Sequence, residues 1–281
     1  MSLSGDMHDG GRRGAGTRLA ALGAATVQAG RAALDLSAFA ASVLATAAAR
    51  DTWRRPVRAA FRHTLHRLAV RGFGTLVVAG AVLGLTLVAQ LLYWLDVTGQ
   101  GELAGTVVVR VLVREIVPIM TGLILFGRMG MAILIDLGEA RPRGWLRELE
   151  RRGLDPLALM VVPRVLGFAV GALCIATVLL ASTMFFGYLG ASALGLVAYS
   201  IWDFSEIVLR AMDASDFIVP PLKCLLIGFF VALVCCATGL ARDDAEDELQ
   251  RLLSRGFVRV ALAILIVNGL FDLVGWHGLL G

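Results

Sequence analysis

Three charged side chains interrupt an otherwise apolar stretch between residues 105 and 135: Arg110, Arg114 and Glu115. Arg110 and Arg114 are four residues apart and share one face of a helix, whereas Glu115 points elsewhere. A charged side chain inside the hydrocarbon of a membrane costs several kcal/mol unless it faces protein or water. These residues therefore either pin neighbouring helices together or line a polar cavity, and the sequence leaves both interpretations open.

Further polar residues lie in two later apolar stretches. Lys223 is a candidate partner of Glu115. Asn268 and Asp272 are four residues apart, so they share a helix face and are candidates for the same cavity lining. Asp272 would equally be wetted at the membrane surface if its helix ends there. The chemistry that such groups offer is the binding of a polar or charged group.

The sequence contains no motif for hydrolysis or metal binding. It has no P-loop, no HExxH and no GxSxG motif. All four cysteines lie inside apolar stretches, where they serve as small hydrophobic residues. We therefore expect the chain not to be an enzyme and to hold no cofactor or metal of its own.

The elements that position these residues are long apolar segments. The 281-residue chain is 58% hydrophobic and only 17% charged, whereas a soluble domain has about a quarter charged residues. The charges are concentrated between the apolar stretches, as a bilayer requires. The sequence predicts an all-α polytopic membrane protein with about five transmembrane helices, at about 73–95, 105–135, 157–189, 217–240 and 258–279. Pairs such as Gly80 and Gly84 allow close helix approach.

The positive charges indicate an orientation. Of the 26 Lys and Arg residues, eleven precede the first span, seven lie from Arg128 to Arg164 and four from Arg242 to Arg259. The loops of the opposite side contain only Arg210. Because cytoplasmic loops carry the positive charge, we expect the N-terminus in the cytoplasm and, after five spans, the C-terminus outside.

Two segments precede the predicted permeation domain at 73–281. Residues 1–50 are rich in Ala, Gly and Arg, and a weakly amphipathic helix or a mobile tail is favoured over a twin-arginine signal. Residues 51–72 place six arginines among apolar residues at helical spacing. This second pattern is typical of a basic interfacial helix that lies on an anionic membrane surface.

A short charged helix is predicted between the second and third spans. Pro142 can open it and Gly153 can close it. Trp145, Leu146 and Leu149 form a modest apolar stripe. Such a helix can dock into the groove of a partner or remain a solvated loop helix, and its composition does not distinguish the two.

Several motifs resemble one family. The run from Arg114 to Gly130 is similar to the second-span signature of MlaE/YrbE-type permeases. The runs Gly153–Pro156 and Val162–Leu166 match a later passage of that family. Asp216 and Lys223 have its D-x6-K spacing. The resemblance extends over roughly residues 61–275.

The resemblance implies a bacterial inner-membrane permease subunit of an ABC transporter. Two copies of the chain would work with a cytoplasmic ABC ATPase, which holds ATP and Mg, and with a periplasmic MCE-domain protein. The cargo would be phospholipid or a related membrane lipid, with no role for nucleic acid. The family's lipid cavity, near the dimer interface, would include Arg114, Glu115, Asp216, Lys223 and Asn268. Its ATPase coupling helix would include Glu139, Arg143, Trp145, Leu146, Arg147, Glu148, Leu149 and Arg151.

Two departures predict a divergent member. The segment from Ala140 to Gly153 differs from the family's usual coupling sequence, and Asn268 stands where the family commonly has Asp. Neither the lipid nor the direction of transport follows from the sequence. Two other functions remain open: an ion- or proton-coupled carrier that uses Glu115 and Lys223 as a relay, and a non-transporting membrane scaffold.

Overall fold

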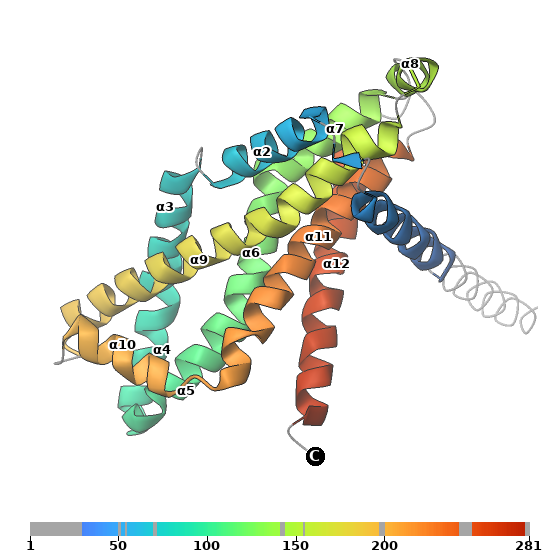
Figure 1. Cartoon of the computed structure of the whole chain (residues 1–281). Coiled ribbons are helices and arrows are strands. Elements are labelled where there is room, and N and C mark those ends of the chain that lie inside the picture. Colours follow the sequence, from blue (N-terminus) through green and yellow to red (C-terminus); the bar gives the residue numbers. More distant parts are fainter. Residues whose placement is uncertain are drawn as a thin grey trace, which may run out of the picture.

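A computed structural model describes residues 30–49, 52–53, 55–69, 72–140, 144–153, 155–196, 200–241 and 249–278. Every regular element in these ranges is helical, and they contain no β-strand. The fold is the predicted all-α class. The helices form one elongated bundle (Figure 1).

Five helices in the described ranges are long and apolar enough to cross a membrane: Gly30–Ala48, Phe73–Val97, Leu157–Ala193, Ala214–Leu240 and Gln250–Leu273. The last four correspond to predicted spans; the ends of the first three of these differ by up to four residues, whereas the last begins eight residues earlier than predicted. The chain is therefore a multi-pass membrane protein, as predicted. The first of the five falls within the segment expected to be an amphipathic helix or a tail.

The helix Gly30–Ala48 packs on the bundle through one stripe. Val43 is fully buried in the main hydrophobic core, and Leu36, Phe39, Ala40 and Ala47 pack against that core. Most of its other residues are exposed, and the helix projects away from the bundle (Figure 1). It thus has the amphipathic stripe that was expected, together with enough length and hydropathy to cross a membrane.

The predicted second span is a continuous helical segment along the bundle (Figure 1). It is not among the five helices named above, and it carries Arg110, Arg114 and Glu115 in its first half. Its consecutive parts are α5 (Ala104–Val108), the π-helical η4 (Val109–Ile116), α6 (Val117–Leu125), η5 (Phe126–Gly130) and α7 (Met131–Ala140).

The other spans surround two central helices, α9 (Val162–Ala193) and α11 (Val219–Leu240). The largest fully buried side chains include Phe168, Ile175 and Leu179 of α9 and Leu233 of α11. Short segments precede these helices: η6 (Leu157–Val161) before α9, and η7 (Ala214–Phe217) before α11. The first predicted span consists of three consecutive parts: α3 (Phe73–Leu83), η2 (Gly84–Val88) and α4 (Ala89–Val97). The last span is α12 (Leu249–Gly278).

Small residues allow the close contacts of this bundle. A Cβ atom at Gly84 would lie 2.4 Å from the backbone oxygen of Thr183, and one at Gly80 would lie 2.4 Å from Cβ of Ser182. The predicted close approach at this glycine pair is therefore confirmed, with α9 as the neighbour. Without glycine at these positions the first span could not pack against α9 at this distance.

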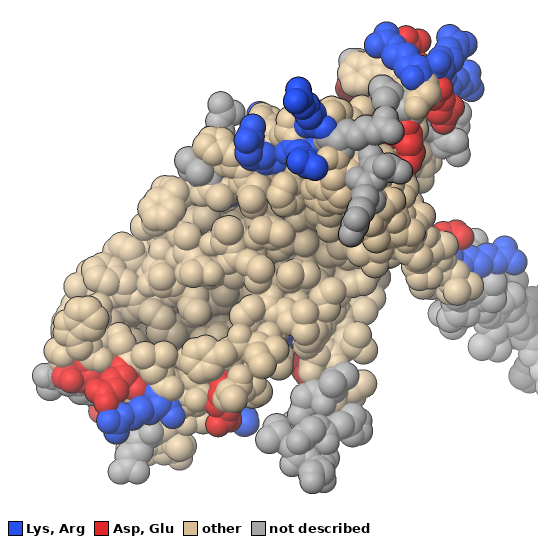
Figure 2. Space-filling view, viewed as in Figure 1, with Lys and Arg blue, Asp and Glu red and all other residues tan. Residues whose placement is uncertain are grey.

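The two ends of the bundle carry different charges. The helix α2 (Arg55–Ala69) lies across one end, with Val57, Thr64 and Leu68 buried against the bundle and its arginines outside. The short helix α8 (Trp145–Arg151) stands out at the same end (Figure 1). Figure 2 shows basic side chains there, with acidic ones among them on α8, and a smaller group of both charges at the other end near α10 (Ile201–Arg210).

Candidate functional site

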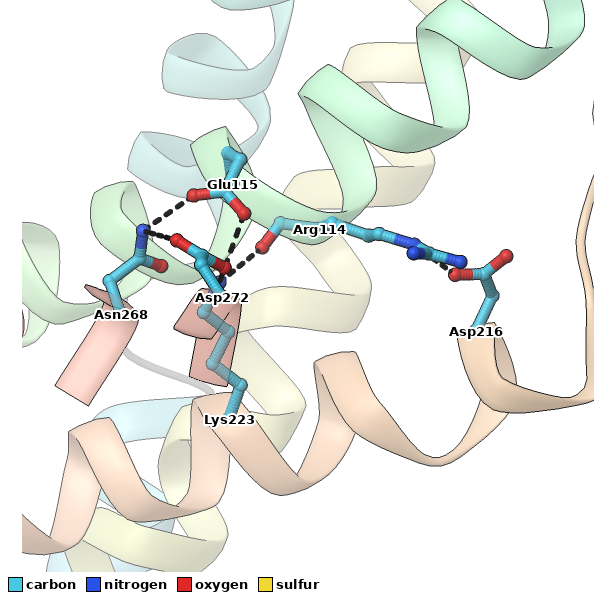
Figure 3. Close-up of polar contacts among 6 residues, drawn as sticks. All are labelled: Arg114, Glu115, Asp216, Lys223, Asn268 and Asp272. Carbon is cyan, nitrogen blue, oxygen red and sulfur yellow. Dashed lines mark hydrogen bonds and ion pairs between the residues drawn. The ribbon is translucent and has the colours of Figure 1, made fainter. Parts of the chain in front are cut away.

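Six polar residues from three spans meet inside the bundle and form what we call the polar cluster (Figure 3). The π-helical η4 supplies two of them, the start of the fourth span supplies two, and α12 supplies two. The members are Arg114, Glu115, Asp216, Lys223, Asn268 and Asp272. The five residues predicted to line a lipid cavity are thus brought together, and Asp272 joins them.

Lys223 is the centre of the cluster. Its side chain is 2% exposed, and its Nζ donates to the backbone oxygen of Arg114 at 2.9 Å, to Oε1 of Glu115 at 3.1 Å and to Oδ1 of Asp272 at 2.9 Å. An ammonium group has three donors, and all three are used. The ion pair between Glu115 and Lys223 that the sequence suggested is therefore present.

Asn268 joins the two carboxylates from the other side. Its Nδ2 donates to Oε2 of Glu115, and to Oδ2 of Asp272 at 3.3 Å. Because both neighbours are acceptors, the amide nitrogen must face them, and Oδ1 is turned away. That Oδ1 atom is buried and has no hydrogen-bond partner among the described residues. Asp272 thus supplies Lys223 with a carboxylate one turn after Asn268.

Arg114 links this group to Asp216. Its Nε donates to Oδ1 of Asp216, whose side chain is 2% exposed. The other carboxylate oxygen of Asp216 accepts from the backbone N–H of Asp213 at 3.0 Å. Asp216 is thereby held in a capping box at the start of η7 and cannot rotate freely. The loop before the fourth span is fastened to η4 by this ion pair.

The helical geometry of η4 matters to the cluster. This eight-residue π-helical segment contains both Arg114 and Glu115. Insertions of this kind are frequent at functional sites because they change the direction in which side chains leave a helix. Here the side chain of Arg114 reaches the fourth span, while that of Glu115 reaches α12 (Figure 3).

The cluster is partly open. The side chains of Glu115, Asp272 and Arg114 are 35%, 46% and 31% exposed, whereas Lys223 and Asp216 are buried. Its formal charge is −1, because three carboxylates face two cations. The buried ammonium of Lys223 thus holds two half-exposed carboxylates in place, whereas the partly exposed guanidinium of Arg114 pairs with the buried carboxylate of Asp216. Such an arrangement can bind a polar headgroup, and it contains no nucleophile paired with a base for covalent chemistry.

An apolar groove is formed in part by η4, the segment that also carries Arg114 and Glu115. It has a volume of about 200 Å³ and runs between the first span and η4. Ile116, which follows Glu115, is part of its wall. The other lining residues are Leu87, Val88, Gln90, Leu91, Trp94, Val111 and Leu112. Polar and apolar surfaces therefore adjoin within one segment, as an amphipathic ligand would require.

The short charged helix predicted between the second and third spans is present as α8, and its residues are fewer than those predicted for ATPase coupling. Glu139 lies in the last turn of α7 rather than in α8, and Arg143 lies outside the described residues. Gly153 has a φ of 69° and follows the helix end, so it closes the helix as predicted. No residue of α8 is buried. A crevice of about 580 Å³ separates Leu146, Arg147 and Glu150 from the start of α9.

Two polar contacts outside the cluster were not anticipated. Arg128 donates to the backbone oxygen of Leu68 at 3.2 Å, at the end of α2. Arg164 pairs with Asp136 at 3.2 Å and joins α9 to α7.

Asp272 was considered for the cavity but not assigned to it. Its spacing of four residues from Asn268 was the available signal, but no sequence rule shows which face of α12 turns inward.

The fold and the cluster define a multi-pass membrane protein with a built polar site inside its spanning region. Comparison with known families then places the chain: the family model described as Permease MlaE matches residues 61–274. Because this match covers most of the chain, the protein belongs to the MlaE permease family. The predicted family is thereby confirmed.

Individual relatives are distant. The chain is 26% identical to a probable ABC transporter permease protein of Rickettsia prowazekii, over 58% of this chain and 62% of that protein. It is 26% identical to a probable ABC transporter permease protein of Synechocystis, over 74% and 79%. It is 30% identical to the intermembrane phospholipid transport system permease protein MlaE of Haemophilus influenzae, over 36% and 38%. The chain thus spans about three-fifths of the first relative's length.

Proposed function

We propose that the chain is the permease subunit of an ABC transporter that moves phospholipid or a related lipid between the inner membrane and a periplasmic MCE-domain partner. Membership of the MlaE family supports a permease without enzymatic activity of its own. The name of the Haemophilus influenzae relative supports a phospholipid as the cargo. ATP hydrolysis would take place on a separate ATPase subunit.

The polar cluster carries this proposal. A lipid headgroup would meet the half-exposed carboxylates of Glu115 and Asp272, which Lys223 holds in position. An acyl chain would lie in the apolar groove along Ile116. Polar residues inside a membrane are costly and mark substrate pathways when they face a cavity. Three spans contribute polar side chains to this one site. A single ion pair would be enough to hold two helices together, so the cluster is larger than that structural role requires.

The proposed partners follow from the exposed elements. A cytoplasmic ATPase would dock on α8, which contributes no buried residue to its own chain. A second copy of the chain would close the open side of the polar cluster. The basic residues of α2 and α8 support a cytoplasmic position for that end of the bundle, and hence a cytoplasmic N-terminus and a periplasmic C-terminus.

Transfer of labelled phospholipid tests the proposal. The chain would be purified together with its ATPase and MCE partners and placed in vesicles, and ATP-dependent lipid transfer would be measured. Glu115→Gln should lower the transfer rate about tenfold or more, because the variant removes a charge from the site. Glu206→Gln is the matched control, since Glu206 pairs with Arg210 on exposed α10. Normal transfer per folded molecule of Glu115→Gln would show that Glu115 only holds helices together.

One observation favours a second candidate function. Lys223 lies between two carboxylates that are partly exposed, which is an arrangement that a proton- or ion-coupled carrier can use as a relay. The two functions differ in their energy source. Transport that continues without ATP but stops when the proton gradient is collapsed would favour the carrier. Failure of a stoichiometric ATPase to co-purify in mild detergent would also favour it.

A further inference from the structure

Arg110 is a cation in the spanning region that the polar cluster does not use. It lies in η4, one turn before Arg114, and its side chain is exposed. No hydrogen bond or ion pair joins it to another residue in the part of the chain that the structure describes. An arginine inside a membrane protein normally pairs with an acid, a carbonyl group or a bound ligand.

The nearby acids are already engaged. Arg110 is near enough to Asp216 to attract it, but Asp216 uses one oxygen for Arg114 and the other for the backbone of Asp213. Glu115 uses one oxygen for Lys223 and the other for Asn268. Arg110 is therefore the cation of η4 that is left for a ligand from outside the chain.

The surroundings of Arg110 indicate what kind of ligand this is. Arg110 follows the start of α5 at Ala104 by six residues, which is about 9 Å along a helix axis. With the membrane surface taken at the start of the predicted second span, this depth is close to the boundary between headgroups and hydrocarbon, since the headgroup layer is about 5–7 Å thick on each side. The next residues, Val111 and Leu112, line the apolar groove. Arg110 itself is not part of the lining, but an anion bound to it would be one residue away from an apolar groove, as the phosphate of a lipid would be.

We propose that Arg110 binds the phosphate group of the transported lipid and makes the site selective for lipids that carry a phosphate. The planar guanidinium offers paired N–H donors that match phosphate oxygens. The acyl chain would run from Arg110 along Leu112 and Ile116. This inference rests on the proposed function, because it names the part of the cargo that one residue recognises.

Lipid binding to the purified full-length chain in mixed-lipid nanodiscs tests the inference. The probes are fluorescent phosphatidylglycerol and fluorescent diacylglycerol, which have the same acyl chains but differ in the phosphate. Wild-type protein should bind phosphatidylglycerol more tightly. Arg110→Gln should weaken that binding about tenfold, as expected for one lost charge-assisted contact, and leave diacylglycerol binding unchanged.

Two further variants make the result specific. Arg110→Lys keeps the charge and should retain most of the preference. Arg210→Gln removes an exposed arginine of α10 that pairs with Glu206, and it should have no effect. An unchanged preference in Arg110→Gln would overturn the inference and leave an acidic surface of a partner protein as the ligand of Arg110. An equal loss of both lipids would overturn it too, because the role would then be structural. Failure of the wild-type chain to bind either lipid would instead count against the proposed function.

Discussion

The polar cluster and α8 are both charged, but different interactions hold their charges in place. In the cluster, Lys223 and Asp216 are buried; Lys223 makes three hydrogen bonds to distant parts of the chain, and Asp216 makes one, to Arg114. In α8, the ion pair between Arg152 and Glu148 at 2.8 Å is local and exposed. The cluster is thus a product of tertiary packing, whereas α8 is a local helix that is available to another protein.

This difference has energetic consequences. Removing one partner of a buried ion pair leaves an uncompensated charge and costs about 3–5 kcal/mol. An exposed pair four residues apart in a helix contributes only about 0.3–0.5 kcal/mol. Substitutions in the cluster should therefore change folding and function together, whereas substitutions in α8 should change only the interaction with a partner.

The largest effect is expected at Lys223. Lys223→Met removes the ammonium group between Glu115 and Asp272 and leaves two carboxylates facing each other. We expect the free energy of unfolding in detergent to fall by about 3–5 kcal/mol. Denaturant unfolding followed by tryptophan fluorescence measures it. Arg210→Met, an exposed cation in a local pair, is the control. A similar small loss in both variants would show that the cluster is not held by Lys223.

A smaller effect is expected at Asn268. Asn268→Asp replaces a donor to Glu115 and Asp272 by a fourth carboxylate in the cluster, so it should cost about 2 kcal/mol of unfolding free energy. The double variant Asn268→Asp with Asp272→Asn keeps the number of charges and should recover most of that loss. If Asn268→Asp alone is as stable as the wild type, Asp272 does not fill the place of the family's usual aspartate.

A local effect is expected where α2 meets the second span. A Cβ atom at Gly72 would lie 1.9 Å from Nη2 of Arg128, so Gly72→Ala must displace that guanidinium from the carbonyl of Leu68. The side chain can move, and the cost should be about 1 kcal/mol, that of a lost hydrogen bond. Hydrogen exchange should become faster in the last turn of α2. Gly74→Ala is the control, because no atom lies within 4 Å of that Cβ position.

The smallest effect on stability is expected in α8. Reversing both charges, with Arg147→Glu and Glu148→Arg, should change the unfolding free energy by less than about 0.5 kcal/mol. Lipid-stimulated ATPase activity of the assembled transporter should nevertheless fall at least severalfold, because α8 is the proposed docking element. The corresponding reversal at Glu206 and Arg210 of α10 serves as the control. Unchanged ATPase activity in the α8 variant would mean that the ATPase docks elsewhere.

Much of the architecture could be predicted from the sequence because bilayers impose strong local rules. Four of the predicted spans coincide with long apolar helices, since about twenty apolar residues are both necessary and visible in a sequence. The glycine pair Gly80 and Gly84 indicated a close contact but not its partner, which is α9. The end of α8 at Gly153 was predictable because a positive φ favours glycine.

Hydropathy was a poorer guide to two helices. The helix Gly30–Ala48 proved long and apolar enough to cross a membrane, although Arg31 and Asp35 lie near its start. The helical spacing of its apolar residues can be read from the sequence. Whether those residues pack on the bundle depends on the direction that the following residues give to the helix. There, Trp53 donates to the backbone oxygen of Ala47 at 2.9 Å. The segment from Ala104 to Ala140 is charged, yet it lies along the bundle, and Arg114, Glu115 and Asp136 meet partners from other spans.

The sequence by itself determined four of the long apolar helices, the uneven distribution of arginines and the family to which the chain belongs, because each of these depends on composition and spacing along one chain. Tertiary structure decided which polar side chains meet. Lys223 reaches Asp272 across 49 positions of sequence, and Arg114 reaches Asp216 across 102. The rotation of α12 and the π-helical geometry of η4 set those contacts, and both arise from helix packing rather than from local residue preference.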